Sequence, residues 1–276
     1  MTGGERSGAF IATKEHRRFT EFADAGREHR SIGLCFGAAG VGKTLSARRY
    51  ARWDVAAPLL VGWGPRQDSD AKVYAALAGH RAVFYTPSVC CPFRELREDI
   101  AGLISRVGIC IDQHVRREQL ARLTELLIVD EAERLTTTAV EHRRDVFDRT
   151  GIGVILIGMP GIEKRLSRYP QLDSRVGFAH HYRPLQGDEL TFVLTRHWRQ
   201  LGLSLDEADF TDVQAMASIT RITGGNFRLL HRLFVQIGRI LKINGLSVIT
   251  DDVVEAARST LVIGATWRRR RTTSFL

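Results

Sequence analysis

The stretch Gly37-Ala38-Ala39-Gly40-Val41-Gly42-Lys43-Thr44 decides how the rest of the chain is organised. It fits the pattern G-x-x-x-x-G-K-[ST] at every fixed position. The short apolar run before it, residues 31–36, predicts a buried strand, and residues 45–51 after it predict a helix. A strand, a glycine-rich loop and a helix in this order form a cradle for a chain of phosphates.

Each residue type in this stretch has a chemical reason. Gly37, Gly40 and Gly42 let the backbone turn tightly, so that successive N–H groups can face a phosphate chain, and the start of the following helix favours anions. Lys43 would reach the β- and γ-phosphates, and the hydroxyl of Thr44 would hold Mg²⁺. We therefore expect ATP and Mg²⁺ to bind along Gly37, Ala38, Ala39, Gly40, Val41, Gly42, Lys43, Thr44 and Leu45. The alternative is a glycine-rich turn that matches by chance, and the flanking elements argue against it.

A second signal is the run Leu126-Leu127-Ile128-Val129-Asp130-Glu131, in which four apolar residues end in two carboxylates. The run is typical of a buried parallel strand with acids at its carboxyl end. On a strand neighbouring that of the phosphate loop, Asp130 would hold Mg²⁺ and Glu131 would polarise the attacking water. The alternative is that the acids cap a helix from Ala132 to about Arg149. The phosphate loop favours the nucleotide site.

Composition limits the class of protein. The chain has 276 residues, 44% hydrophobic and 26% charged, and a net charge of +9, and only five of its forty basic residues are lysines. An excess of positive charge favours a polyanionic partner such as nucleic acid, although drift toward arginine would also explain the Arg:Lys ratio. No run reaches the ~18 apolar residues of a membrane span, and the N-terminus lacks the apolar segment of a secretory signal, so we expect a cytoplasmic protein. The four cysteines have no metal-type spacing and are interpreted as reduced thiols.

The order of the predicted elements indicates the fold class. Predicted strands at 82–85, 126–129 and 154–157 alternate with helices at 13–29, 70–77 and 92–105, which predicts an open parallel sheet flanked by helices, with a ligand at the carboxyl ends of the strands. Beyond Pro184 only helices are predicted, at 188–201, 211–223, 226–244 and 251–261. We expect an N-terminal helical extension (1–30), an α/β nucleotide-binding domain (31–184), a helical lid domain (185–262) and a basic tail (263–276).

Together, the phosphate loop, the segment Asp130-Glu131-Ala132-Glu133-Arg134-Leu135, a following strand, an arginine-bearing loop and a helical lid resemble an AAA+ ATPase. Two further segments, 156–166 and 169–176, make the chain similar to transposition regulators of the TniB/TnsC/Mu B type. The resemblance covers roughly residues 19–261. It implies an ATPase that assembles into a ring or helical filament on double-stranded DNA, selects target DNA and recruits a transposase, with hydrolysis driving disassembly.

The resemblance also assigns roles to single residues. Arg175 resembles the arginine finger that a neighbouring subunit directs at the γ-phosphate, with Arg165 and Arg168 as substitutes and a surface salt bridge as the alternative. Arg228, after Gly224-Gly225-Asn226, resembles the sensor-2 arginine of the lid, or is a solvated helix residue. One departure concerns Gly158-Met159, where most AAA+ proteins have a polar residue that orients the water. We therefore expect hydrolysis to be slow or to depend on DNA or a partner.

DNA contacts are predicted at Arg94 and Arg97, after the second strand, and at the tail residues Arg268, Arg269, Arg270 and Arg271. Such contacts would be sensitive to salt and largely independent of sequence; an exposed charged helix face is the alternative for the first two. Two other functions stay open: an AAA+ helicase loader, and a nucleotide-switched scaffold or signalling module that does not bind DNA.

Overall fold

The computed structural model describes residues 10–89, 92–115, 123–135, 151–168 and 175–261. The described part of the chain forms two compact units, one within residues 12–183 and a smaller one that joins residues 10–11 to 184–261. The tail arginines Arg268 to Arg271 lie outside the described residues, as do residues 136–150 of the helix expected after the acidic pair.

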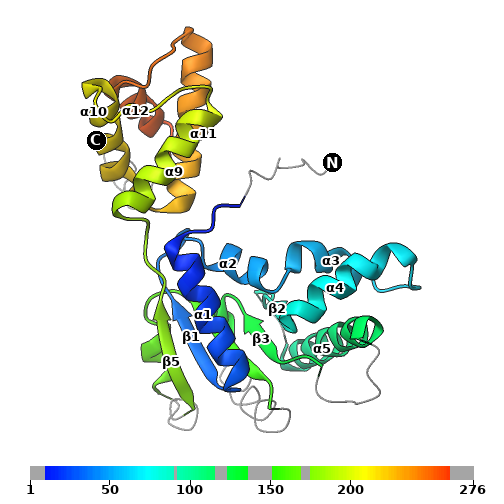
Figure 1. Ribbon diagram of the computed structural model, residues 1–276. Helices are drawn as coiled ribbons and strands as arrows, with labels where there is room; N and C mark the ends of the chain where they lie inside the picture. Colours follow the sequence, from blue (N-terminus) through cyan, green and yellow to red (C-terminus); the bar gives the residue numbers. More distant parts are fainter. Residues whose placement is uncertain (1–9, 90–91, 116–122, 136–150, 169–174, 262–276) are drawn as a thin grey trace, which may run out of the picture. The chain divides into compact units, whose positions relative to one another are not determined.

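The larger unit is built on a five-stranded, wholly parallel sheet with the strand order β2-β3-β4-β1-β5 (Figure 1). Its strands are β1 (Ile32–Phe36), β2 (Ala82–Tyr85), β3 (Leu126–Val129), β4 (Gly153–Gly158) and β5 (Val176–His181). Because all strands run in the same direction, their carboxyl ends meet at one edge of the sheet. The predicted parallel sheet is confirmed.

Helices cover both faces of this sheet. On β2, Phe84 contacts the Trp53 ring at a centroid distance of 5.9 Å, whereas the hydroxyl of Tyr85 donates to Asp99 at 3.1 Å. Successive side chains of a strand point to opposite faces, so the helices that carry Trp53 and Asp99 lie on opposite sides of the sheet. The helices of this unit are α1 (Lys14–Glu28), α2 (Lys43–Tyr50), α3 (Trp53–Val61), α4 (Ala71–His80), α5 (Phe93–Val115) and α7 (Ile162–Leu166), with short 3₁₀ turns at Asp68–Asp70 and Ala132–Arg134.

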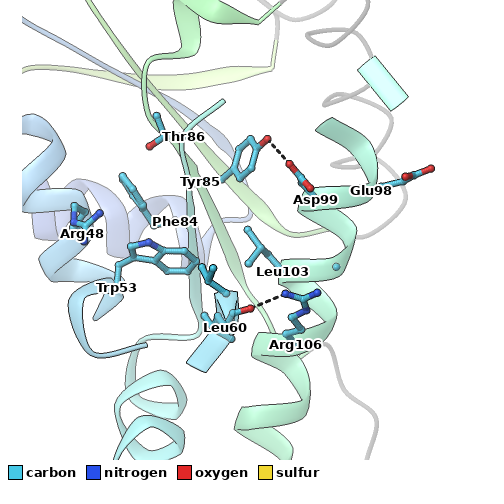
Figure 2. A pocket seen from close by; sticks show the side chains of 12 residues that line it. Arg48, Trp53, Leu60, Phe84, Tyr85, Thr86, Glu98, Asp99, Leu103 and Arg106 are labelled. Carbon is cyan, nitrogen blue, oxygen red and sulfur yellow. Dashed lines mark hydrogen bonds between the residues drawn. The ribbon is translucent and has the colours of Figure 1, made fainter. Parts of the chain in front are cut away.

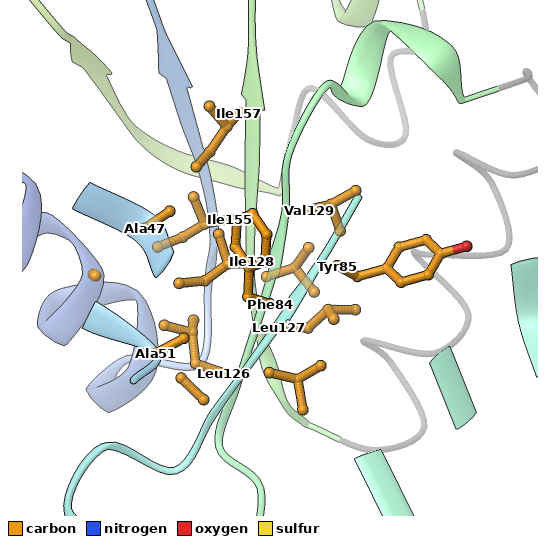
Figure 3. Close-up of a cluster of buried hydrophobic side chains, with 14 of the residues drawn as sticks. Ala47, Ala51, Phe84, Tyr85, Leu126, Leu127, Ile128, Val129, Ile155 and Ile157 are labelled. Atoms are coloured by element: carbon orange, nitrogen blue, oxygen red, sulfur yellow. The ribbon is translucent and has the colours of Figure 1, made fainter. Parts of the chain in front are cut away.

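The core of the larger unit is formed by the central strands and the helices packed on them (Figure 3). All four residues of β3 are fully buried, and Ala47 of α2 and Ala51, which caps that helix, are also inaccessible to solvent. Strands buried on both faces read as continuous runs of Val, Ile and Leu, which explains why β3 and β4 were recognisable in the sequence. The same packing fixes the strand ends that carry the loops described below.

Several local expectations were wrong. A further strand, β5, forms at one edge of the sheet next to β1, where no strand was expected. Helix α3, with Pro58 inside it, forms where no helix was expected, and α5 extends ten residues beyond the expected end at 105. The turn at Ala132–Arg134 is 3₁₀ rather than the first turn of an α-helix. Finally, β4 lies between β1 and β3, so the acidic pair does not stand on the strand adjacent to that of the phosphate loop.

The smaller unit contains α9 (Gly187–Gln200), α10 (Phe210–Thr223), α11 (Phe227–Asn244) and α12 (Asp251–Ser259), which confirms the four helices expected beyond Pro184. Their buried faces form a core that includes Trp198, Leu230 and Ile237. The side chain of Asn226 accepts a hydrogen bond from the backbone N–H of Leu229 at 3.2 Å, as expected for a cap that contributes about 1 kcal/mol to helix stability.

No helix in the described part of the chain has both the length and the apolar composition to cross a bilayer.

Candidate nucleotide-binding site

The glycine-rich segment between β1 and α2 has the backbone that a phosphate cradle requires. Gly40 and Gly42 have φ values of 82° and 117°, a region that residues with a Cβ rarely adopt. Gly37 is needed for a different reason: a Cβ there would lie 2.3 Å from the carbonyl oxygen of Tyr182. Helix α2 begins at Lys43 without a side-chain cap, so its first N–H groups face the glycine turn. We call residues 37–45 the phosphate loop.

Lys43 is buried, and its ammonium group donates to the backbone carbonyls of Gly37 at 2.6 Å and Ala38 at 2.8 Å. These bonds hold the cation above the loop, and an arriving phosphate oxygen would replace them as the acceptor. Around Lys43, Ala38, Ala39, Thr44 and Leu45 are exposed to solvent, whereas Val41 is buried beneath the loop. The backbone and the exposed side chains are thus open to a ligand.

The structure brings the two sequence signals together. The carboxylate of Asp130, which follows β3, accepts a hydrogen bond from the side chain of Thr44 in the phosphate loop. Asp130 is only 4% exposed, and burial raises the pKa of its carboxyl above the usual value, while the bonds from Thr44 and from the backbone of Glu131 and the charge of Lys43 oppose the rise. A hydroxyl and a buried carboxylate in contact are oxygen ligands of the kind that Mg²⁺ prefers.

Glu131 adopts a strained backbone conformation. Its φ is 50°, in the left-handed region that costs a residue with a side chain about 1 kcal/mol or more. Its carboxylate is partly exposed and forms an ion pair with Arg134, three residues further on. Arg134 also donates to the carbonyl of Pro87, just after β2, at 2.8 Å. The candidate general base is therefore tied, through one arginine, to the end of a neighbouring strand.

Tyr182 also contacts this region, although no sequence pattern pointed to it, and Arg165 contacts the segment that follows the acidic pair. The hydroxyl of Tyr182 lies 2.7 Å from that of Ser46 in α2, and both side chains are buried. The guanidinium of Arg165, in α7, donates to the carbonyls of Glu133 and Leu135. Arg165 is thus engaged within its own subunit, which weakens its case as a substitute for the arginine finger.

The end of β4 has no polar side chain. Gly158 stands there, and a Cβ at this position would lie 2.4 Å from Ile162 Cδ1 and 2.9 Å from Oε2 of Glu133. That carboxylate oxygen is buried and has no hydrogen-bond partner among the described residues. Met159, the next residue, is 40% exposed. The carboxylate of Glu133 therefore comes close to the space that a side chain at position 158 would need.

Arg175 precedes β5, which runs parallel to β1 with Val176 paired to Ile32. The phosphate loop follows the other end of β1, so Arg175 and the loop lie at opposite edges of the sheet, separated by about 20 Å of strand. Arg175 cannot reach a nucleotide bound in its own subunit from this position. An interaction with a phosphate would have to involve another subunit.

The remaining predicted site residues lie on other helices. Arg228 lies in the first turn of α11 in the smaller unit, with its side chain exposed. Arg94 and Arg97 are exposed on the first turns of α5, and Arg94 pairs with Glu98 at 2.9 Å. Cys35 is buried in β1 beneath the loop, and burial raises the pKa of its thiol to about 12, as fits an unreactive core cysteine.

A cavity of about 560 Å³ lies on the larger unit, between α3, α5 and the end of β2 (Figure 2). Its lining residues include Trp53, Phe84 and Leu103, and none belongs to the phosphate loop or the acidic pair. Its charged groups are already bonded within the protein: Asp99 accepts from Tyr85, and Arg106 donates to the carbonyl of Leu60 at 2.7 Å. The convergent groups that suit a triphosphate are at the phosphate loop and not in this cavity.

Comparison with known proteins agrees with the geometry. The family model of an AAA domain matches residues 26–166. A potential ATP-binding protein of Staphylococcus aureus is 42% identical over 267 residues, which cover 92% of this chain and 97% of the relative. The DNA transposition protein B of the Mu-like prophage FluMu of Haemophilus influenzae is 25% identical over 233 residues, covering 82% of this chain and 71% of that protein.

Solved structures show the same fold at low identity. The RuvB Holliday junction branch migration motor of Thermotoga maritima aligns with a TM-score of 0.55 and 17% identity, covering 90% of this chain and 68% of that one. The ORC2 protein of Aeropyrum pernix aligns with a TM-score of 0.53 and 14% identity, covering 96% and 73%.

A parallel sheet with a phosphate loop after its first strand, and an acid in contact with that loop, defines a P-loop NTPase. The chain belongs to the AAA family of these proteins. The similarity to a phage transposition protein B confirms the resemblance to AAA+ ATPases of the Mu B type.

Proposed function

We propose that this protein is an ATP-dependent, DNA-binding, oligomeric regulator of transposition. In this proposal, ATP binding orders subunits on duplex DNA, the assembly recruits and activates a transposase at the chosen target, and hydrolysis drives disassembly. The observation that carries the nucleotide part is the contact between Thr44 and Asp130, which joins the phosphate loop to the acidic pair. The similarity to a transposition protein B supports the rest.

The chain's own residues suggest how the site would work. Backbone N–H groups of the phosphate loop and the ammonium of Lys43 bind the β- and γ-phosphates, and Thr44 with Asp130 would hold Mg²⁺, which supplies charge neutralisation on the phosphates. Glu131 takes a proton from the attacking water once its carboxylate leaves Arg134. The step needs a water placed in line with the γ-phosphate. Because Gly158 has no side chain, the end of β4 offers no polar group to orient that water.

Completion of the site would depend on assembly. Arg175 lies at the opposite edge of the sheet from its own phosphate loop, so its proposed role is to stabilise charge on the γ-phosphate of a neighbouring subunit, an effect worth ~10³ or more in rate. Arg228 would contact the nucleotide from the lid. A site that lacks a polar group at the end of β4 and draws one cation from a neighbour would hydrolyse ATP slowly until subunits assemble. Such a site suits a switch more than a motor.

Binding to a labelled DNA duplex tests this function. We expect fluorescence anisotropy to rise with a slowly hydrolysed ATP analogue and Mg²⁺, and to stay low with ADP. Lys43→Ala should abolish nucleotide-dependent binding because the phosphate charge loses its partner, whereas Lys164→Ala, which removes an exposed lysine of α7, should behave as the parent. Tight ATP binding without DNA binding in any nucleotide state would contradict the proposal and favour a nucleotide-switched scaffold.

A further inference from the structure

Helix α11 differs from the rest of the smaller unit in its charge. Between Pro184 and Leu261 the sequence has eight Lys or Arg residues and nine Asp or Glu residues, so the region as a whole is close to neutral. Four of the eight cations lie in α11, which contains no acidic residue over its 18 positions. The positive charge of the unit is therefore concentrated on one helix.

The cations of α11 form a single row. Arg228, Arg232, Arg239 and Lys242 stand at positions i, i+4, i+11 and i+14, which fall on one face of a helix with 3.6 residues per turn. At a rise of 1.5 Å per residue the row is about 21 Å long. The opposite face, with Leu230, Leu233, Phe234, Ile237 and Leu241, is buried in the core of the unit. The row is thus held on a rigid element and cannot turn inward.

The row is exposed and its charges are not neutralised nearby. The side chains of Arg232, Arg239 and Lys242 are exposed to solvent, and within the described ranges none of the three forms an ion pair. The cations of the adjacent helices behave differently, since Arg221 and Arg258 both pair with Glu255 at 3.0 Å. Three unneutralised cations on a fixed face are a surface that would attract a polyanion.

We propose that Arg232, Arg239 and Lys242 on α11, here called the α11 row, bind the phosphate backbone of duplex DNA. This inference rests on the proposed function and assigns its DNA contact to the lid helix. Arginine suits phosphate because its planar guanidinium donates two parallel hydrogen bonds. A membrane surface fits poorly, because an interfacial helix must bury its apolar face in lipid and the apolar face of α11 is occupied by the unit's own core.

Arg94 and Arg97 compare poorly with this row. The first turns of α5 also contain Glu95, Glu98 and Asp99, and Arg94 is already paired with Glu98. A phosphate of DNA would have to displace the carboxylate of Glu98 from Arg94 and would also come close to the carboxylates of Glu95 and Asp99. Arg228 continues the α11 row at its N-terminal end, but its proposed contact with the nucleotide excludes it from the test.

The test compares two matched variants of the full chain by fluorescence anisotropy on a 40-base-pair duplex with the slowly hydrolysed ATP analogue. In the first variant, Arg232, Arg239 and Lys242 are all changed to Gln; in the control, Arg221 and Arg258 are changed to Gln. We expect the first to bind DNA at least about tenfold more weakly at low salt, and the slope of log K against log [salt] to fall by about three, one for each lost phosphate contact. The control should keep the parent affinity and slope.

Two further measurements separate the possible outcomes. ATP binding and the melting temperature should be the same in the triple variant and the parent. A variant with Arg232→Lys and Arg239→Lys, which keeps both charges, should retain most of the DNA binding of the parent. If the parent binds DNA and the triple variant binds equally well with an unchanged slope, only the α11 assignment is overturned. If the parent binds no DNA in any nucleotide state, the DNA-binding part of the proposed function fails as well. Loss of binding to phosphatidylserine vesicles in the triple variant, with DNA binding retained, would instead indicate a membrane surface.

Discussion

The hydroxyl of Tyr182 lies 2.7 Å from the hydroxyl of Ser46, and the carbonyl of the same tyrosine lies against Gly37. Tyr182 follows the last residue of β5, and Ser46 is in the first turn of α2, so the tyrosine contacts the first residue of the phosphate loop and the residue that follows its last. Burial raises the pKa of Tyr182 to about 12, so the phenol stays protonated and can donate or accept this bond at any physiological pH. The residue that follows β5 thus helps to hold the phosphate loop in place.

Changing Tyr182 to Phe should weaken ATP binding. The change removes one hydrogen bond, worth about 1 kcal/mol, and leaves the hydroxyl of Ser46, which is only 2% exposed, without this partner. Ser46→Ala should lower the affinity for ATP less than Tyr182→Phe does. The double variant should bind ATP as tightly as Tyr182→Phe alone, because the two side chains act through one hydrogen bond. Titration calorimetry with ATP measures the cycle, and Tyr74→Phe is the control. Additive losses would mean that the bond does not support the loop.

Changing Glu131 to Gln should preserve ATP binding and abolish turnover, because an amide cannot take a proton from water. Changing Arg134 to Gln should raise the basal rate of ATP hydrolysis several-fold, since the carboxylate of Glu131 loses the cation that holds it. Phosphate release under saturating ATP measures both. Unchanged turnover in Glu131→Gln would exclude this residue as the base, and a lower rate in Arg134→Gln would show that the ion pair helps to position it.

Arg175 should act only between subunits. We expect Arg175→Ala to bind ATP normally but to lose most of its assembly-dependent hydrolysis, because the residue lies at the sheet edge away from its own phosphate loop. Mixing this variant with Lys43→Ala should restore part of the activity, since each variant supplies what the other lacks. Arg199→Ala, at an exposed position of α9, serves as the control. A silent mixture would contradict a role in trans.

The buried carboxylate of Asp130 should lower the stability of the ligand-free protein, because it is held in place as a proposed ligand for Mg²⁺. Because burial raises its pKa, the folded protein keeps a proton that the unfolded chain loses above the usual value of 3.8, and the free energy of unfolding falls as pH rises through that window. Asp130→Asn should therefore raise the melting temperature at pH 7 without ligand and remove the further increase caused by Mg²⁺ and ATP. Thermal melts with and without both ligands measure this, and a lower melting temperature without ligand would contradict it.

His197, in the smaller unit, should control acid unfolding. Burial, with a smaller contribution from His231, lowers the pKa of its imidazole to about 4, and the ring stacks on Phe234 at 4.5 Å. Between about 6.5 and 4 the unfolded chain binds a proton that the folded protein does not, so up to about 3 kcal/mol of unfolding free energy is lost as the pH falls through this range. His197→Phe should flatten the pH dependence of denaturant unfolding, whereas a change at the exposed His29 should not. An identical profile in His197→Phe would contradict the assignment.

The sequence identified the elements whose side chains alternate strongly or are buried on both faces. The strands β1 to β4 and the helices of the smaller unit were expected close to their actual bounds. Strand β5 was not, because Val176-Gly177-Phe178-Ala179-His180-His181 contains Gly and two His residues and lies at a sheet edge, where only alternate residues are covered. Helix α3 was missed because Pro58 lies inside it, beyond the first turn where proline is usual.

The residues of the candidate site likewise include some that the sequence predicted and some that it did not. Lys43, Thr44 and Asp130 were recognisable because spacing along the chain fixes their chemistry, and the structure places Thr44 and Asp130 in contact. Tyr182 was not, because its contact with Ser46 spans 136 positions and no local pattern encodes it. The position of β4 between β1 and β3 likewise depends on how the strands assemble. The cations of the α11 row recur at helical spacing in the sequence, but only the burial of the opposite face shows that they point outward.

The crowding around Gly158 limits how this enzyme could change. A side chain there would have to displace Cδ1 of Ile162 and would come close to the carboxylate of Glu133, so adding the water-orienting Asn, Ser or Thr of other AAA+ proteins has a packing cost. A smaller residue at 162 would remove that cost, although the α7 helix would lose part of its own packing. We therefore expect laboratory selection for a faster ATPase to recover changes at 158 paired with changes at 162 more often than a replacement of Gly158 alone.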